Sequence, residues 1–168
     1  MRLIKNRAII NNQWRLDRDD GDRADVVGGD DANAVGGDNA VNEHIIMPLA
    51  RWLAMRGDAS ARGVGVLLQP DDRVEDLADD LNRIALIALE FGAFNEGRGY
   101  SQAARLRRQH HFRGEIRALG AHRDNLPLME RCGIDAYELV DGEDLAESLS
   151  AFEEITEYYE HAPRAVST

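Results

Sequence analysis

Short apolar runs alternate with helix-like stretches through the middle of the chain, and this alternation constrains the fold more than any other feature. The runs cover residues 64–68, 84–91, 115–119 and 136–140. Consecutive strand–helix units place their strands side by side and parallel. The spacing therefore predicts an α/β fold with about four strand–helix units around a parallel sheet. An open sheet and a half-barrel both satisfy this pattern.

Helices are expected beside these strands from their start and stop signals. Pro48 is suited to a first helical turn, Ser101 and Asp124 can cap helix starts, and Gly133 can end a helix. The sequence from Asp72 to Glu75 resembles a capping box. The expected helices cover residues 48–56, 72–83, 101–109, 124–132 and, as an amphipathic C-terminal helix, 143–159.

The N-terminal quarter has a different character. Residues 3–16 alternate loosely around Asn11-Asn12, which predicts a small β-hairpin. Residues 17–42 are rich in Asp, Gly, Asn and Ala, which is typical of a flexible loop. The Gly-Gly pairs in this loop lack the Lys-Ser/Thr of a phosphate-binding loop. We expect one domain over residues 1–168, with residues 64–140 as its α/β core.

Composition excludes several classes of protein. Cys132 is the only cysteine, so disulfide frameworks, multi-cysteine zinc sites and iron–sulfur clusters are excluded. The longest apolar run is far too short to span a membrane, and the N-terminus lacks the apolar segment of a signal peptide. A formal net charge of −11 disfavours binding to nucleic acid or to anionic membranes. We therefore expect a cytoplasmic protein without a metal or a tightly bound cofactor.

The charges are nevertheless segregated along the chain. Residues 98–131 hold eight arginines against three acidic residues, whereas residues 135–160 hold ten acidic residues and no Lys or Arg. Arg105, Arg107 and Arg108 fall on one predicted helix, where they form either a solvated face or a docking surface for an acidic partner. Arg117 and Glu115, two positions apart on one strand, can pair on the same face of the sheet.

Ligands of parallel sheets bind at the carboxyl ends of the strands. The loops at these ends contain Asp71, Asp72, Arg98, Tyr100, Ser101, His122, Arg123, Asp124 and Asp141. The Gly97–Ser101 sequence combines backbone amides, a helix start and a guanidinium, which suits an oxyanion such as phosphate, sulfate or sulfite. The predicted anion site consists of Arg98 and Arg123 for charge, with Gly99, Tyr100 and Ser101 as the backbone cradle.

Other roles compete for the same residues. Arg98 can form a structural ion pair with Glu96, Asp71 or Asp124. Asp71, Asp124 and His122 are the candidates for a general acid or base, although Asp124 is equally explained as a helix N-cap. Cys132 is interpreted most simply as a core residue.

Three segments resemble one bacterial family. Residues 91–107 (FGAFNEGRGYSQAARLR), 114–120 (GEIRALG) and 129–137 (MERCGIDAY) resemble the domain-of-unknown-function 934 family, whose genes commonly lie beside those of assimilatory sulfite reductase. The matching positions are Arg98, Gly99, Tyr100, Ser101, Arg105, Arg117, Asp124, Arg131 and Cys132. The chain departs from the family pattern at Glu96, at Ala121-His122 and at Asn125, so no catalytic role is carried over to His122.

The resemblance implies an accessory role in the reduction of sulfite to sulfide, with residues 98–131 docking sulfite reductase or its electron donor. An arginine-lined oxyanion site is compatible with that role. Two alternatives stay open. One is a small α/β enzyme that acts on a phosphorylated or sulfur-containing metabolite, with Asp71 or Asp124 as acid or base. The other is a non-catalytic protein that forms a homo-oligomer through an open sheet edge.

Overall fold

A computed structural model describes residues 1–18, 44–58, 62–92 and 96–154. Almost all of the loop expected at 17–42, and the last residues of the helix expected at 143–159, lie outside the described residues.

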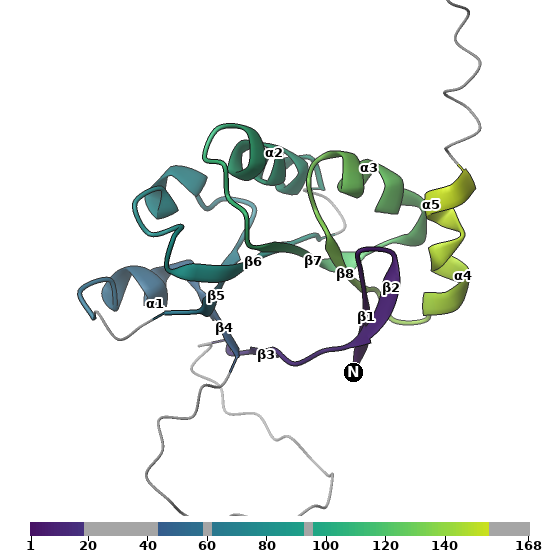
Figure 1. The fold of residues 1–168 in the computed structure, drawn as a ribbon, viewed down its shortest axis with the longest axis horizontal. Coiled ribbons are helices and arrows are strands. Elements are labelled where there is room, and N and C mark those ends of the chain that lie inside the picture. Colours follow the sequence, from purple (N-terminus) through teal and green to yellow (C-terminus); the bar gives the residue numbers. More distant parts are fainter. Residues whose placement is uncertain (19–43, 59–61, 93–95, 155–168) are drawn as a thin grey trace, which may run out of the picture.

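The strands form one mixed, curled sheet (Figure 1). They are β1 (Arg2–Lys5), β2 (Ala8–Asn11), β3 (Arg15–Leu16), β4 (Ile45–Pro48), β5 (Val64–Leu68), β6 (Ile84–Glu90), β7 (Glu115–Ala121) and β8 (Ala136–Leu139). The spatial order is β2-β1-β8-β7-β6-β5-β4-β3. Strands β3 to β8 run parallel to one another, whereas β1 runs antiparallel to both β8 and β2. The fold is therefore an α/β half-barrel, and the expectation of a purely parallel sheet is wrong at the N-terminal hairpin.

The helices cover the outer face of the curled sheet (Figure 1). They are α1 (Leu49–Ala54), α2 (Glu96–Arg108), α3 (Leu126–Arg131), α4 (Leu145–Leu149) and α5 (Ala151–Glu154), with 3₁₀ turns η1 (Val74–Leu77) and η2 (Arg123–Asn125). Their apolar side chains, among them Trp52, Leu106 and Met129, share one core with outward-facing strand residues such as Ile87 and Tyr137. Burial of this apolar layer is what places the helices on one side of the sheet.

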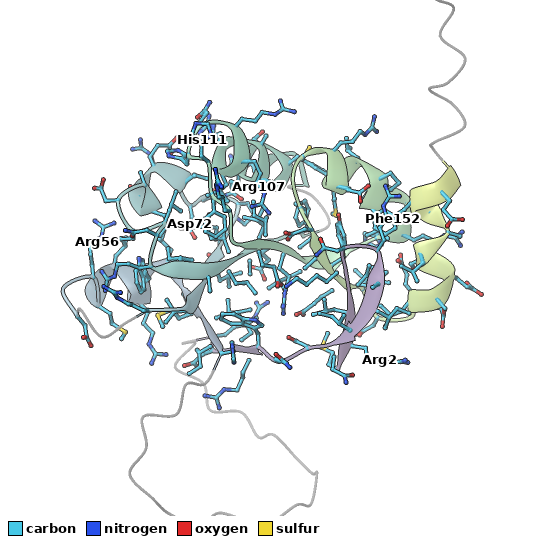
Figure 2. The ribbon with its side chains drawn as sticks, in the orientation of Figure 1. Arg2, Arg56, Asp72, Arg107, His111 and Phe152 are labelled. Carbon is cyan, nitrogen blue, oxygen red and sulfur yellow. The ribbon has the colours of Figure 1, made fainter. Side chains whose placement is uncertain are left out.

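The inner face carries a second, smaller apolar cluster. It consists of Ile46, Leu67, Leu86, Ala88 and Leu119, with Trp14 and Leu16 packed against it. Figure 2 shows side chains filling the space inside the curl.

Arg117 is buried on the same inner face, with 1% of its side chain exposed. Its register partners on β6 and β8 are Ala88 and Ala136, whose small side chains leave room for the arginine. As predicted, Arg117 pairs with Glu115 on its own strand, with Nε 2.7 Å and Nη2 2.6 Å from Glu115 Oε1.

The network around Arg117 joins the N-terminal hairpin to the parallel strands. Arg117 Nη1 donates to Asn12 Oδ1 at 2.8 Å and to Glu138 Oε1 at 3.1 Å. Lys5 Nζ on β1 donates to Glu115 Oε2 at 2.7 Å. We call these five residues the inner charge network; it contains two cations and two carboxylates, so the buried charges balance.

The predicted hairpin forms, but its turn lies earlier in the chain than predicted. The chain reverses at Asn6 and Arg7, whose φ angles are 50° and 61°, and not at Asn11-Asn12. Two successive left-handed residues form the tight turn that matches the twist of antiparallel strands, and Asn tolerates this conformation well. Asn12 instead contributes its side chain to the inner charge network.

The prediction of a helix over residues 72–83 is wrong. Only the η1 turn forms there, followed by further turns. The Asp72 side chain accepts from the Gln69 amide, behind it in the chain, and therefore forms no capping box. Asp80 is buried and accepts from Trp52 Nε1 at 3.1 Å and from Arg56 Nε at 2.7 Å, which holds this acidic segment against α1. Closely spaced Asp and Asn residues are also poor helix formers.

The remaining elements follow the sequence with shifted ends. The four predicted strands are confirmed as β5 to β8, whereas β3 and β4 were missed. Helix α2 begins at Glu96, five residues earlier than expected from Ser101. The expected helix 124–132 is divided into η2 and α3, with Asp124 inside the first turn instead of at the N-cap, and Gly133 follows at φ +100° as predicted. The C-terminal helix is also divided, and Asp144 caps α4 by accepting from the Glu147 amide.

Candidate functional site

Two hollows open at the carboxyl ends of β4 and β5, and Asp72 lines both. The first hollow, which we call the α2 hollow, has a volume of about 550 Å³. The second, which we call the β4–β5 hollow, has a volume of about 510 Å³. Both volumes lie within the range of about 300–1,000 Å³ that is typical of small-molecule sites.

One side of helix α2 forms a wall of the α2 hollow. Arg98, Ser101, Gln102 and Arg105 are spaced three or four positions apart, so they lie on the same side of the helix. Pro70, Asp72 and Gly97 complete the lining. Gln102 is buried, and its Nε2 donates to the carbonyls of Gln69 at 2.9 Å and Asp72 at 3.0 Å, which fixes the loop after β5 against α2.

The two arginines of this hollow are held by exposed ion pairs. Arg98 pairs with Asp71, and 58% of the Arg98 side chain is exposed. Arg105 Nη1 lies 3.2 Å from Glu75 Oε1, again with both side chains exposed. The hydrogen bond from the backbone amide of Glu75, followed by the charge of Arg105, lowers the pKa of the Glu75 carboxyl. Exposed pairs of this kind contribute at most about 1 kcal/mol, so a ligand can exchange with the carboxylates.

The predicted backbone cradle is only partly formed. Because α2 begins at Glu96, the amides of Gly97 and Arg98 lie in its first turn, where amides lack helical partners. Gly99 instead makes room for Phe91, since a Cβ at position 99 would lie 2.6 Å from Phe91 Cζ. Tyr100 packs edge-on against the same Phe91 ring, with the ring centroids 5.3 Å apart. These contacts give Gly99 and Tyr100 packing roles beside the hollow.

Arg123 and His122 lie beside the C-terminal helices. The Arg123 amide donates to Glu143 Oε2 at 2.6 Å, and its guanidinium donates to Ser150 Oγ at 3.1 Å. His122 Nδ1 lies 3.2 Å from Glu143 Oε1, an orienting partner that the sequence did not reveal. The structure thus places Arg98 and Arg123 in separate groups of contacts. Asp124 and Asp141 are both exposed.

The three arginines near the end of α2 differ in role. Arg107 donates to the carbonyls of Gly133, Phe112 and Gly114 and to the Asp135 carboxylate. These four acceptors occupy most of the N–H donors of the guanidinium. Arg107 therefore connects α2 to the sheet instead of forming a docking face. Arg105 and Arg108 are exposed.

The β4–β5 hollow contains charged residues that the sequence did not single out. Arg18 follows strand β3, and Arg51 lies on α1. Arg18 Nη1 is 2.9 Å from Glu90 Oε1, and Arg51 Nη1 is 2.5 Å from Asp17 Oδ2. Neither arginine belongs to a motif, and the predicted helix at 48–56 had no strand in front of it to indicate that Arg51 lies near a sheet edge.

The part of the chain that the structure describes contains neither a cluster of metal-ligating side chains nor a membrane-spanning helix. Within residues 1–18, 44–58, 62–92 and 96–154, no group of three or more His, Cys, Asp or Glu side chains is placed to hold a metal ion. No helix in these ranges is long and apolar enough to cross a membrane.

Comparisons with known proteins place the chain in a family without assigning an activity. No curated protein and no solved structure matches it. A family model described as "Bacterial protein of unknown function (DUF934)" matches residues 65–168, from β5 through the end of the chain. This match covers more than half of the sequence and includes the α2 hollow from Pro70 onward, so the chain belongs to the DUF934 family.

Proposed function

We propose that this protein binds a small oxyanion in the α2 hollow and serves as an accessory protein of assimilatory sulfite reduction. The observation that carries the oxyanion part is the line of Arg98, Ser101 and Arg105 along one side of α2, facing the hollow. Two guanidiniums, a hydroxyl and the first-turn amides of a 13-residue helix are groups that bind oxyanions.

The carboxylates beside these arginines are compatible with this function. Asp71 and Glu75 compensate the arginine charges while no ligand is bound. Because both pairs are exposed, an oxyanion replaces them at little cost in free energy. Gln102 keeps the loop carrying Asp72 in place during the exchange, since it is bonded to that loop through two backbone carbonyls.

The sulfite part of the proposal rests on the family. The resemblance to the DUF934 family implies genes beside those of assimilatory sulfite reductase, and sulfite is an oxyanion of suitable charge. Arg105 and Arg108 supply an exposed basic surface next to the hollow, which suits docking to an acidic surface of the reductase or of its electron donor.

Thermal unfolding with sulfite, sulfate and inorganic phosphate tests the oxyanion site. A ligand at about one hundred times its Kd stabilises the folded state by about 2.7 kcal/mol. We expect sulfite to raise the Tm of the wild type, and the rise to be lost in Arg98→Gln and in Arg105→Gln. Arg108→Gln, an exposed arginine on the same helix outside the hollow lining, is the matched control and keeps the rise. A rise that persists in both hollow variants, or no rise with any of the anions, refutes the site.

Binding to purified sulfite reductase and to its electron donor tests the accessory role. We expect a complex that weakens with ionic strength and is lost in the double variant Arg105→Glu/Arg108→Glu. Absence of a complex with either protein at low ionic strength would contradict the docking part.

A further inference from the structure

We propose a second binding site, in the β4–β5 hollow, for a small zwitterionic metabolite of the α-amino-acid type. The proposal is independent of the oxyanion site, because the arginines involved differ and only Asp72 lines both hollows. The lining of this hollow combines charged side chains with several apolar ones, which favours an organic molecule as the ligand.

The position of the hollow is the one at which α/β sheets bind ligands. Pro48 and Leu67 line it, and they are register partners near the carboxyl ends of the parallel strands β4 and β5. Residues at this end of a parallel sheet or barrel face the connecting loops, and ligands bind in the crevice outside the strands.

Two guanidiniums supply a carboxylate-binding side. Arg18 and Arg51 are each oriented by an ion pair through Nη1, with Glu90 and Asp17 respectively. A guanidinium has five N–H donors, so a single-atom pair leaves donors to form a fork with a ligand carboxylate. The two acidic partners therefore orient the arginines toward the hollow instead of consuming them.

Asp72 supplies the opposite charge. Its Oδ2 accepts the Gln69 amide at 2.8 Å, which fixes the carboxylate in the wall of the hollow. The lining thus combines two cationic side chains, Arg18 and Arg51, with the carboxylate of Asp72. A molecule with both a carboxylate and an ammonium group is compatible with all three.

Apart from Gln69, the rest of the lining is apolar. Ala50 and Ala54 lie one turn apart on α1, and their methyl groups keep that wall back from the buried floor at Leu67. Pro48 and Leu49 add further apolar surface. This wall suits a short aliphatic side chain, which distinguishes a small apolar amino acid from glycine or from a large polar one.

Titration calorimetry with four probes separates these contributions on the ligand side. L-valine carries the carboxylate, the ammonium and the branched side chain; 3-methylbutanoate lacks the ammonium, 2-methylpropylamine lacks the carboxylate, and glycine lacks the side chain. We expect L-valine to bind at least tenfold more tightly than each of the other three.

Three variants locate the site on the protein side. Arg51→Gln is expected to weaken L-valine binding at least tenfold, and Asp72→Asn to weaken L-valine while leaving 3-methylbutanoate unchanged or tighter. Ala54→Leu fills the hollow from an exposed helical position without removing a charge, and blocks binding of all probes. Arg98→Gln is the control and keeps L-valine binding, and circular dichroism melts verify that each variant is folded.

Equal affinities for L-valine and 3-methylbutanoate would refute the proposal that the ligand is a zwitterion. So would unchanged L-valine binding in Ala54→Leu, or no binding of L-valine by the folded wild type. Failure of the oxyanion site has a different signature, because it abolishes the sulfite-induced rise in Tm and leaves L-valine binding in place.

Discussion

Replacing Arg117 by Met is expected to be the most damaging single substitution of an arginine in this fold. Arg117 lies in the inner charge network, with 1% of its side chain exposed, and donates to Glu115, Glu138 and Asn12. Met has a similar length and no charge. The substitution therefore preserves most of the packing and removes the positive charge together with its hydrogen bonds.

The magnitude follows from the burial of the carboxylates left behind. Glu115 and Glu138 have 9% and 17% of their side chains exposed, so water replaces little of the lost interaction. Removing one partner of a buried ion pair destabilises a protein by about 3–5 kcal/mol. Lys5 on β1 still neutralises Glu115. The expected loss of unfolding free energy is therefore at the lower end of this range, about 3 kcal/mol.

Urea denaturation at pH 7 measures this loss as a lower midpoint with an unchanged m-value. A thermal melt is expected to show a drop of roughly 6–12 °C, at about 2–4 °C per kcal/mol for a chain of this size. Arg108→Met, at an exposed position, is the control and is expected to change stability by less than about 0.5 kcal/mol. Adding Glu138→Gln to Arg117→Met should recover part of the loss, because Arg117 is the cation that pairs with Glu138, whereas Glu115 keeps Lys5.

A loss below about 1 kcal/mol for Arg117→Met would refute the reasoning, since that is the value of an exposed ion pair. Failure of Glu138→Gln to recover any stability would show that packing, and not charge, determines the effect.

The remaining predictions concern packing, titration and the hairpin turn. Gly99→Ala places a Cβ 2.6 Å from the Phe91 ring and is expected to lower the unfolding free energy by about 1–2 kcal/mol in urea titrations, with Phe91→Leu relieving the clash. Burial, opposed by the Ile116 amide and by Arg107, raises the pKa of the Asp135 carboxyl in the folded state, so the folded protein binds a proton there more tightly than the unfolded chain does. The stability of the wild type relative to Asp135→Asn should therefore fall as the pH rises from the ordinary pKa of an aspartate through the raised one, and a constant difference would contradict this. Asn6→Ala, at φ 50°, should cost about 1 kcal/mol in a thermal melt, whereas Asn6→Gly should be nearly neutral.

The repeating part of the fold could be predicted because its signals are local. Each of β5 to β8 is a short apolar run followed by a helix or turn signal, and consecutive parallel strands then lie side by side. The Glu115–Arg117 pair also followed from the two-residue period of a strand. These predictions require no knowledge of distant contacts.

The missed elements depend on distant contacts. Strand β4 is four residues long and ends in Pro48, which on its own indicates a helix start, and only pairing with β5 shows that the preceding residues are extended. The segment after Asp72 lacks a helix because Asp80 bonds to Trp52 and Arg56, more than 20 residues earlier. Neither partner can be identified from the local pattern.

The same limit applies to the arginines, and it explains why the predicted anion site is only partly assembled. Along the chain, residues 98–131 have a clear excess of positive charge, but folding gives these arginines carboxylates from elsewhere. Asp71 pairs with Arg98, Glu75 with Arg105 and Asp135 with Arg107. The basic segment 98–131 and the acidic residues that pack near it thus form one set of ion pairs.

Under the proposed function, a ligand-binding arginine would differ from a structural one in the exposure of its ion pair, and not in its charge. Arg117 is 1% exposed, and exchanging its carboxylates for a ligand would leave buried charges unpaired. Arg98 is 58% exposed, and Asp71 can return to water when a ligand arrives. Exposure depends on the packing of the folded chain, so the sequence offers candidates for an anion site but cannot show which of their ion pairs stay exposed after folding.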